Sequence, residues 1–385
     1  AATNWAPPTA EQVGLIGTHW SKGWIIEDNT IRYSVCTGVT LGKYGDKWDN
    51  TSADSAVGYV KTIERATEEA GWSKENIGHH IVRNNHVSHC EQAGIVGSLG
   101  AIFSKITGNT IHDIHVRRLF GGHEQAGIKF HAPIDSLIAD NHIYRTSRGM
   151  WLDWMMQGTR VTRNLLHDNS PGEDLFIEVN HGPFVVDNNI LLSKTSLLDF
   201  SQGGCYAHNL ISGRMLLQPQ GRKTPYHPAH STKVAGLSKI MGGDNRFYNN
   251  LFVGGSGIAH YTKVGMPNFA LGNVYLQGAK ALSGEDDSLK FLDFDAKMKF
   301  SFKQDKPSLQ VILPEGLHKG KRPLITSKLL GLAKISNLPF MNYDEAPLAI
   351  NRDFFGNKRN EKIPSAGPFG NTVPGKLTLN VSKKK

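Results

Sequence analysis

An asparagine followed directly, or after one residue, by an aliphatic side chain recurs along most of the chain, and this repeat restricts the fold more than any other feature. Neighbouring copies mostly lie about 20 to 32 residues apart, a period typical of solenoids and β-helices. Two longer gaps leave room for excursions from a regular coil. The copies are Asn29-Thr30-Ile31, Asn85-His86-Val87, Asn109-Thr110-Ile111, Asn141-His142-Ile143, Asn164-Leu165-Leu166, Asn189-Ile190-Leu191, Asn209-Leu210-Ile211, Asn250-Leu251-Phe252 and Asn273-Val274-Tyr275.

The residues around these asparagines favour a corner between two strands. Many copies follow a short apolar run, such as Phe184-Val185-Val186, and precede another. Asparagine tolerates the left-handed backbone that a tight corner requires, and stacked corners let asparagines hydrogen-bond in a ladder. Gly94, Gly127 and Gly149 predict further corners. A single coil cannot bury its apolar face alone, so neighbouring coils must stack.

The repeat therefore predicts an all-β fold, a right-handed parallel β-helix over residues 1–280. A β-sandwich with asparagine turns is the alternative, but it would need hairpins spaced about 8 to 12 residues apart. One helical excursion is predicted at about residues 52–71. Thr51 or Ser52 would cap it, Val57, Val60 and Ile63 would share one face, and the helix would stop near Gly71.

The repeat fades after about residue 280. Residues 281–340 mix apolar and charged side chains and contain Pro307, Pro314 and Pro323, which predicts a β-rich excursion in short pieces. Residues 341–385 are predicted to form a C-terminal tail that packs along the β-helix.

The net charge of +9 at pH 7 raises the question of an anionic partner. Much of the excess lies late in the chain, in Lys319-Gly320-Lys321-Arg322 and Lys383-Lys384-Lys385. No basic helix or nucleic-acid motif accompanies it. We therefore expect a solvated basic surface and no nucleic-acid partner, with an acidic polysaccharide as the competing explanation.

The sequence contains neither a run of about 18 apolar residues nor a signal-peptide pattern. We expect no membrane association, and a cytoplasmic protein if the chain is complete. The cysteines are too few for a disulfide framework and are predicted to be small buried hydrophobes. They are Cys36, Cys90 and Cys205.

Neither metals nor cofactors are expected. His79-His80 lacks a partner at the spacing of a zinc site. The acidic residues Asp46, Asp49 and Asp54 do not follow an EF-hand pattern and are predicted to cap a loop.

Four strand-like segments on successive coils are largely apolar and end on an ionisable residue. They are Gly127-Ile128-Lys129-Phe130-His131, Gly149-Met150-Trp151-Leu152-Asp153, Asp174-Leu175-Phe176-Ile177-Glu178 and Ser196-Leu197-Leu198-Asp199. Rungs of a parallel sheet lie about 4.8 Å apart. Carboxylates on adjacent rungs would then lie about 5 to 5.5 Å apart, the separation found in retaining glycosidases. Because stacked like charges are unfavourable, this pattern indicates function.

In such a pair, one carboxylate stays ionised as a nucleophile while its neighbour holds a proton and acts as general acid/base. Asp153 and Glu178 fit these roles. Trp151 should share the face of Asp153, while Leu152 points to the core. Tryptophan rings pack on pyranose faces, and nearby polar groups can bind sugar hydroxyls. The candidate substrate contacts are His123, Glu124, His131, Trp151, Trp154, Asn180 and His181.

Several long runs resemble glycoside hydrolase family 120, most closely from residue 1 to about residue 280. These runs are Asn4-Trp5-Ala6-Pro7-Pro8-Thr9-Ala10-Glu11-Gln12, Gly78-His79-His80-Ile81-Val82-Arg83-Asn84-Asn85, Gly94-Ile95-Val96-Gly97-Ser98-Leu99-Gly100-Ala101, Trp151-Leu152-Asp153-Trp154 and Glu178-Val179-Asn180-His181-Gly182-Pro183.

The resemblance implies a right-handed parallel β-helix with β-xylosidase activity. It implies Asp153 as the nucleophile, Glu178 as the general acid/base and Glu124 as a substrate contact. The expected partner is xylobiose or a short xylo-oligosaccharide, cleaved from its end with retained configuration. Family members also carry a separate β-sandwich domain, which we do not find in this sequence.

Two other functions stay open. A polysaccharide lyase or another uronate-active enzyme would use Arg117, Arg118 or Lys129 as base, with calcium bridging carboxylates to the substrate. A non-catalytic carbohydrate-binding β-helix would bind sugar without cleaving it. Assembly into a homo-oligomer is a further open point.

Overall fold

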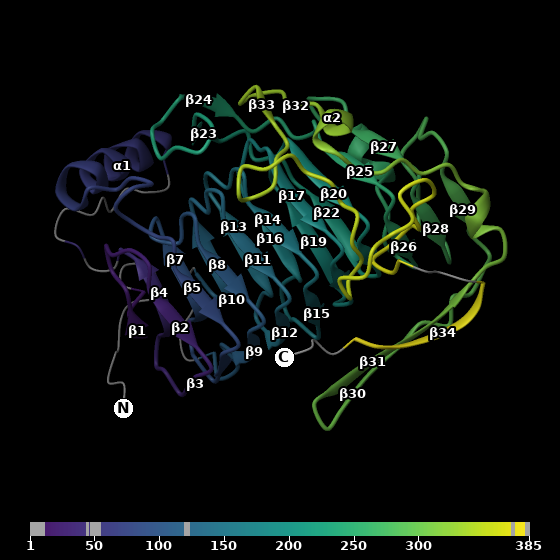
Figure 1. Cartoon of the computed structure of the whole chain (residues 1–385), viewed down its shortest axis with the longest axis horizontal. Helices are drawn as coiled ribbons and strands as arrows, with labels where there is room; N and C mark the ends of the chain where they lie inside the picture. The colour runs from purple at the N-terminus through teal and green to yellow at the C-terminus, as the bar shows by residue number, and fades with distance from the viewer. Residues whose placement is uncertain (1–11, 44–45, 47–54, 119–123, 371–373, 382–385) are drawn as a thin grey trace.

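The computed structural model describes residues 12–43, 46, 55–118, 124–370 and 374–381. Within these ranges the chain winds in successive coils, and most coils contribute one strand to each of three parallel sheets (Figure 1). Each strand pairs with the equivalent strand of the next coil rather than with its neighbour in sequence. The predicted parallel β-helix is confirmed.

We number the three sheets of the coil. Sheet 1 contains β1 (Gly14–Gly17), β4 (Thr37–Gly42), β7 (Ala93–Ser98), β10 (Ala126–His131), β13 (Met150–Asp153), β16 (Leu175–Ile177), β19 (Thr195–Asp199) and β22 (Arg214–Leu217). Sheet 2 contains β2 (Ile25–Glu27), β5 (Ile81–Arg83), β8 (Lys105–Thr107), β11 (Leu137–Ala139), β14 (Arg160–Thr162), β17 (Phe184–Asp187), β20 (Gly204–Ala207), β25 (Arg246–Tyr248) and β27 (Phe269–Leu271). Sheet 3 contains β3 (Thr30–Arg32), β6 (His86–Ser88), β9 (Thr110–Ile114), β12 (His142–Thr146), β15 (Leu165–His167), β18 (Ile190–Leu191), β21 (Leu210–Ile211), β26 (Leu251–Val253), β28 (Val274–Leu276) and β29 (Leu289–Phe291).

Aliphatic side chains stacked from coil to coil fill the interior. The middle residue of each short strand in sheet 2 points inward, so Val82, Ile106, Ile138 and Val161 form one column and are fully buried. Alternate residues of a strand face opposite sides, which sends the flanking residues outward. Each fully buried aliphatic side chain stabilises the fold by about 1.5 to 3 kcal/mol.

The asparagines of the repeat form a continuous ladder at the corner between sheets 2 and 3. The side-chain Nδ2 of Asn29 donates to Asn85 Oδ1 at 3.0 Å, and each later asparagine of the repeat donates to the next at the same distance. The last of them, Asn273, donates to Glu285 Oε1 at 2.7 Å. The ladder predicted from the repeat is confirmed.

The left-handed residue at this corner is not the asparagine, and that part of the prediction is wrong. The residue before each ladder asparagine has the positive φ, because the corner bends one position earlier. These residues are Asp28, Asn84, Gly108, Asp140, Arg163, Asn188, His208, Asn249 and Gly272, with φ from 55° to 67°. The asparagine itself pairs with the next rung through its side chain.

Of the three predicted corner glycines, Gly149 lies in the bend before β13, whereas Gly94 and Gly127 do not mark corners. Gly94 and Gly127 lie within β7 and β10, and Gly149 directly precedes β13. A Cβ at Gly94 would lie 2.6 Å from the Gly127 carbonyl oxygen, and one at Gly127 would lie 2.7 Å from the Gly149 carbonyl oxygen. These glycines therefore permit close stacking of coils in sheet 1.

The predicted helical excursion is α1 (Ala56–Ala70). Ser55 caps it by accepting a hydrogen bond of 3.0 Å from Gly58 N, whereas Thr51 and Ser52 lie outside the described residues. Gly71 ends it with a φ of 67°. The face that α1 buries includes Tyr59 and Ile63, while Val57 is 62% exposed, so the predicted apolar face was partly wrong.

A second excursion lies between β22 and β25. It contains the antiparallel pair β23 (Lys223–Tyr226) and β24 (Gly236–Lys239), which lies next to α1 at one end of the strands (Figure 1). A 3-10 turn, η1 (Ala259–Thr262), follows β26. Among the described residues, no helix is both long and apolar enough to cross a bilayer.

The coil continues past residue 280, because β29 pairs in parallel with β28. After it, β30 (Lys299–Lys303), β31 (Lys306–Leu313) and β34 (Gly375–Asn380) form an antiparallel sheet. This sheet packs on the outer face of sheet 3, where Phe300 lies 4.4 Å from His167 and Phe302 lies 4.8 Å from Tyr144, measured between ring centroids.

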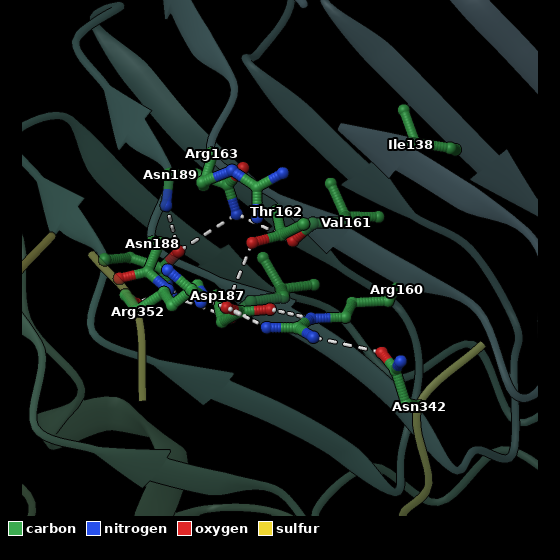
Figure 2. A network of polar contacts seen from close by, with 12 residues as sticks. Ile138, Arg160, Val161, Thr162, Arg163, Asp187, Asn188, Asn189, Asn342 and Arg352 are labelled. Carbon is green, nitrogen blue, oxygen red and sulfur yellow. Dashed lines mark hydrogen bonds and ion pairs between the residues drawn. The ribbon is translucent and has the colours of Figure 1, made fainter. Parts of the chain in front are cut away.

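The segment between β31 and β34 covers part of the outer face of sheet 2. It contains η2 (Leu317–Lys319), α2 (Ser327–Leu330), β32 (Leu332–Ala333) and β33 (Leu338–Pro339). Figure 2 shows the polar network that fixes it. Arg160 donates to the fully buried carboxylate of Asp187 at 2.8 and 2.9 Å and to Asn342 at 3.0 Å, and Asn188 donates to the carbonyl of Arg352 at 3.1 Å.

Candidate active site

Asp153 and Glu178 lie on adjacent rungs of sheet 1. Asp153 ends β13, and Glu178 directly follows β16. Leu152 pairs with Ile177 in the register of the two strands, and Glu178 N donates to the Leu152 carbonyl at 2.9 Å. The two acids therefore occupy equivalent positions on rungs about 4.8 Å apart. Leu152 points into the core, as predicted.

Asp153 is held as an anion by three donors. Its Oδ2 accepts from Lys129 Nζ at 2.7 Å and lies 2.9 Å from His131 Nε2, while Oδ1 accepts from Trp154 N at 2.8 Å. Burial alone would raise the pKa of Asp153, but the Lys129 ammonium and His131 outweigh it and hold the pKa below its usual range.

Lys129 is the cation at the centre of this cluster. Its side chain is fully buried and forms ion pairs of 2.7 Å with Asp153 and 2.8 Å with Glu124 Oε2. Burial favours a neutral amine, yet the two carboxylates raise the pKa of Lys129 overall. A buried ammonium paired in this way fixes the position of Asp153, because moving either carboxylate would leave a buried charge unpaired.

Glu178 has a different environment. Its side chain is 10% exposed, Oε2 accepts from Trp151 Nε1 at 2.8 Å, and Oε1 forms an ion pair with Arg222. Burial and the neighbouring Asp153 charge raise the pKa of Glu178 to about 7, against the opposing effects of Lys129 and Arg222. The two acids thus have pKa values pushed in opposite directions, the arrangement that separates a nucleophile from a proton donor.

The predicted aromatic residues surround the acids but are themselves largely covered. Trp151 is 7% exposed, with Lys129 Nζ 3.9 Å from the centre of its ring and Phe176 packed 5.2 Å away. Trp154 stacks on Tyr59 of α1 at 4.4 Å. These rings therefore form the walls around the acids and position their hydrogen bonds.

The other predicted substrate contacts differ in their surroundings. Asn180 is fully buried and bonds only to backbone groups and Ser201, accepting from Met156 N at 2.7 Å. His181 is buried between Gln202 and Thr224 and so fixes the β23–β24 excursion that carries Arg222. His123 lies outside the described residues. Glu124 and His131 contact the Lys129–Asp153 pair.

Asp199 does not continue the line of acids, and that prediction was wrong. Asp199 pairs with Ile177 rather than with Glu178, so its register differs by one residue from the predicted one. A shift of one residue turns a side chain to the opposite face of the sheet. Asp199 is fully buried in the coil interior, where it accepts from Ser201 N at 2.9 Å and from the Tyr261 hydroxyl at 3.1 Å.

Sequence reasoning missed two residues of the site and gave a third another role. Tyr59 and Arg222 come from the excursions, and the strand pattern contains no signal for them. Lys129 was considered only as a lyase base, although its place two residues before His131, on the same face of the strand, indicated a buried cation beside Asp153.

The remaining polar predictions have simple structural roles. Asp46 accepts hydrogen bonds from His19 and Trp20, and Asp49 and Asp54 lie outside the described residues. The described residues contain no group of three or more His, Cys, Asp or Glu side chains arranged to hold a metal ion. The three cysteines form no disulfide with one another and are buried, as predicted.

A family model for a right handed beta helix region matches residues 14–212. The chain belongs to the right-handed β-helix family. Among solved structures, XylC in complex with xylose is similar over 99% of this chain, with 38% sequence identity and a TM-score of 0.91. The chain spans 65% of the length of XylC. This similarity agrees with the family resemblance read from the sequence.

Two other β-helix structures are more distant. Pectate lyase Pel9A is 11% identical, with 91% of this chain and 88% of that protein covered and a TM-score of 0.42. The periplasmic alginate epimerase AlgG is also 11% identical, with 71% and 60% covered and a TM-score of 0.37. Both are too distant to support an argument about function. The comparison with curated proteins finds no match.

Proposed function

We propose that this β-helix protein is a retaining glycoside hydrolase that releases xylose from the end of xylo-oligosaccharides. The observation that carries the proposal is the pair Asp153 and Glu178 on adjacent rungs, with pKa values pushed in opposite directions. Rungs about 4.8 Å apart match the carboxylate separation of about 5 to 5.5 Å in retaining enzymes.

In the proposed mechanism, Asp153 attacks the anomeric carbon while protonated Glu178 donates its proton to the departing oxygen. A covalent glycosyl–enzyme forms, and the Glu178 carboxylate then removes a proton from water as that water attacks the same carbon. Lys129 and His131 keep Asp153 ionised, and Trp151 orients Glu178 for both proton transfers.

The choice of xylose is supported by the similarity to XylC, which was solved with xylose. Glu124 and His131 are the proposed polar contacts with the sugar, since both lie beside Asp153 and retain some exposure.

The test is hydrolysis of an aryl β-xyloside beside aryl arabinoside, glucoside and galacturonide substrates. We expect the xyloside to be cleaved fastest, with β-xylose as the first product by NMR, and we expect xylotetraose to give xylose and xylotriose first, without xylobiose. If the first product were α-xylose, its inverted configuration would exclude the retaining mechanism. An unsaturated product that absorbs in the ultraviolet would indicate a lyase instead.

Asp153→Asn should lower turnover by about 10³-fold or more while the fold is retained, because the amide cannot form the covalent intermediate. Circular dichroism checks the fold. Glu178→Ala is the matched variant: with a dinitrophenyl leaving group, which needs no proton, it should still form the glycosyl–enzyme, and azide should restore its turnover. Near-normal activity of Asp153→Asn would remove Asp153 from the mechanism.

A further inference from the structure

A cavity lies in the C-terminal layer, away from the two acids. It encloses about 450 Å³ and lies where β27, the approach to β29 and the segment around η2 and α2 meet. This volume is within the range of small-molecule sites. Its lining consists of Leu271, Asp287, Lys319, Gly320, Lys321, Arg322, Pro323, Leu329, Lys362 and Ile363.

The cavity is dominated by positive charge. Lys319, Lys321, Arg322 and Lys362 line it, against the single carboxylate of Asp287. Three of the four cations belong to the basic run Lys319-Gly320-Lys321-Arg322, which the proposed reaction does not use. A concave surface with charge of one sign raises the local concentration of the opposite ion.

Arg322 distinguishes this cavity from a patch of surface lysines. Its side chain is 6% exposed, its Nε donates to the Gly272 carbonyl at 3.0 Å, and its Nη1 donates to the Leu317 carbonyl at 2.9 Å. Nη2 is buried and has no hydrogen-bond partner. Within the described part of the chain, no carboxylate forms an ion pair with Arg322. A buried guanidinium without an anion is unfavourable, so this site is incomplete without a ligand.

Gly320 lies directly beside the unpaired nitrogen. A Cβ at this position would lie 2.7 Å from Arg322 Nη2. The φ of Gly320 is −75°, which any residue can adopt, so the backbone does not require glycine here. The absence of a side chain instead lets the Arg322 guanidinium pack directly against Gly320.

The other walls of the cavity are apolar. Leu271, Pro323, Leu329 and Ile363 line it together with the cations. A suitable ligand therefore presents an apolar face and a negative group together. An acidic sugar does so, since its ring has an apolar face and its carboxylate can accept a charge-assisted hydrogen bond from a guanidinium nitrogen.

We propose that this cavity is an accessory binding site for a uronate residue of an oligosaccharide, with Arg322 as the central anion contact and Lys321 and Lys362 at the rim. The choice of a sugar rests on the proposed function, whereas the need for an anion does not. Such a site would hold a substituted chain on the protein while another part of it reaches Asp153 and Glu178.

The test is calorimetric titration of the whole chain with glucuronate-substituted xylotriose, neutral xylotriose and inorganic phosphate; every chain used for titration also carries Asp153→Asn, so that the proposed hydrolysis does not consume the sugars. We expect the substituted sugar to bind in a salt-dependent manner, and Lys321→Glu with Lys362→Glu to weaken binding by about tenfold, as the loss of charge-assisted hydrogen bonds predicts. Lys303→Glu, which makes the same type of charge change on β30, should bind like the wild type. Gly320→Ala should weaken binding without altering charge.

Equal binding of neutral xylotriose, or equal loss in the Lys303 variant, would overturn the proposal. Binding of phosphate without the substituted sugar would overturn its sugar component. Cleavage of the aryl β-xyloside is measured separately in each variant with Asp153 intact and should stay unchanged. Loss of the accessory site and failure of the proposed catalysis are therefore distinguishable. Arg322→Gln is the direct variant, and the rim variants keep the test valid if it does not fold.

Discussion

The indole Nε1 of Trp151 donates a hydrogen bond of 2.8 Å to Oε2 of Glu178 from the neighbouring rung. This bond stabilises the carboxylate form of Glu178 and fixes its orientation. The same ring is covered by Lys129, so the tryptophan links the two acids of the candidate site.

Trp151→Phe keeps an aromatic ring in place and removes that donor. We expect kcat to fall about tenfold and the alkaline limb of the pH–rate profile to move up by about one unit, because the ionised form of Glu178 loses a donor. Trp154→Phe is the control, since its indole stacks on Tyr59 and no indole bond to Glu178 is lost. Identical profiles for the two variants would contradict this role of Trp151.

The wild-type pH profile follows from the Glu178 pKa of about 7. Glu178 must hold a proton to act as general acid, so kcat/KM should be constant below about pH 6 and fall tenfold per unit above about pH 8. Asp153 stays ionised across this range because its pKa lies below its usual value. Initial rates with an aryl β-xyloside from pH 4 to 9 measure the profile. A rate that rises steadily to pH 9 would contradict the assignment.

Arg222 lowers the pKa of Glu178, so Arg222→Gln should raise it further. The alkaline limb should then move upward by about one unit, as expected for removal of one adjacent cation. Lys223→Gln removes the same charge from the neighbouring exposed residue and should leave the limb in place. The two profiles, measured side by side, separate a local contact from a change in net charge.

Asp199 should affect stability and not turnover. Burial raises its pKa to about 7, above the value in the unfolded chain. The folded state therefore binds the proton more tightly, and this stabilisation is present at low pH and lost as the pH rises through 7. Between pH 5 and 8 the loss is about 2 to 3 kcal/mol. Asp199→Asn keeps an acceptor for Ser201 N. It should remove the contribution of Asp199 to the pH dependence of the free energy of unfolding, measured with urea.

Asp174 serves as the matched control, because burial also raises its pKa to about 7. Asp174→Asn should remove the contribution of Asp174 to the pH dependence of the free energy of unfolding and leave the contribution of Asp199 unchanged. A large loss of xyloside hydrolysis in Asp199→Asn, with stability retained, would show that the third acid belongs to the active site after all.

Alanine substitution in the middle of the asparagine ladder should lower the free energy of unfolding more than substitution at its end. Asn164 accepts from Asn141 and donates to Asn189 and to the Ile138 carbonyl at 3.0 Å. Asn164→Ala leaves several buried groups unpaired and should lower the free energy of unfolding by about 2 to 4 kcal/mol. Asn29→Ala at the exposed end should cost about 1 kcal/mol or less, since water replaces the lost bonds. Equal losses in chemical denaturation would contradict a cooperative buried ladder.

The fold could be predicted because successive coils repeat the same pattern of residues. An inward aliphatic residue and a corner asparagine recur in most turns, so independent copies indicate the same architecture. The rung positions of Asp153 and Glu178 follow from that repeat. The position of Asp199 did not, because its segment is one residue shorter, so that Asp199 pairs with Ile177 of β16 and not with Glu178.

The surroundings of the acids were harder to predict for a different reason. Tyr59 and Arg222 reach the site from excursions that do not follow the repeat, and their approach depends on packing between segments distant in sequence. His181 and Asn180 share a motif with Glu178, yet their side chains turn into the structure and bond to other segments. Proximity in sequence was therefore a poor guide to which polar groups face the same space.

The excursions and the coil differ in how freely they can change. Asp153 and Glu178 depend on strand stacking, which tolerates little alteration, whereas α1 and the β23–β24 pair are insertions that leave the stacking of neighbouring turns intact. Insertions at surface connections vary readily in length and sequence. Descendants of such a scaffold could acquire new substrate preferences by replacing these two segments, while the acid pair is inherited unchanged.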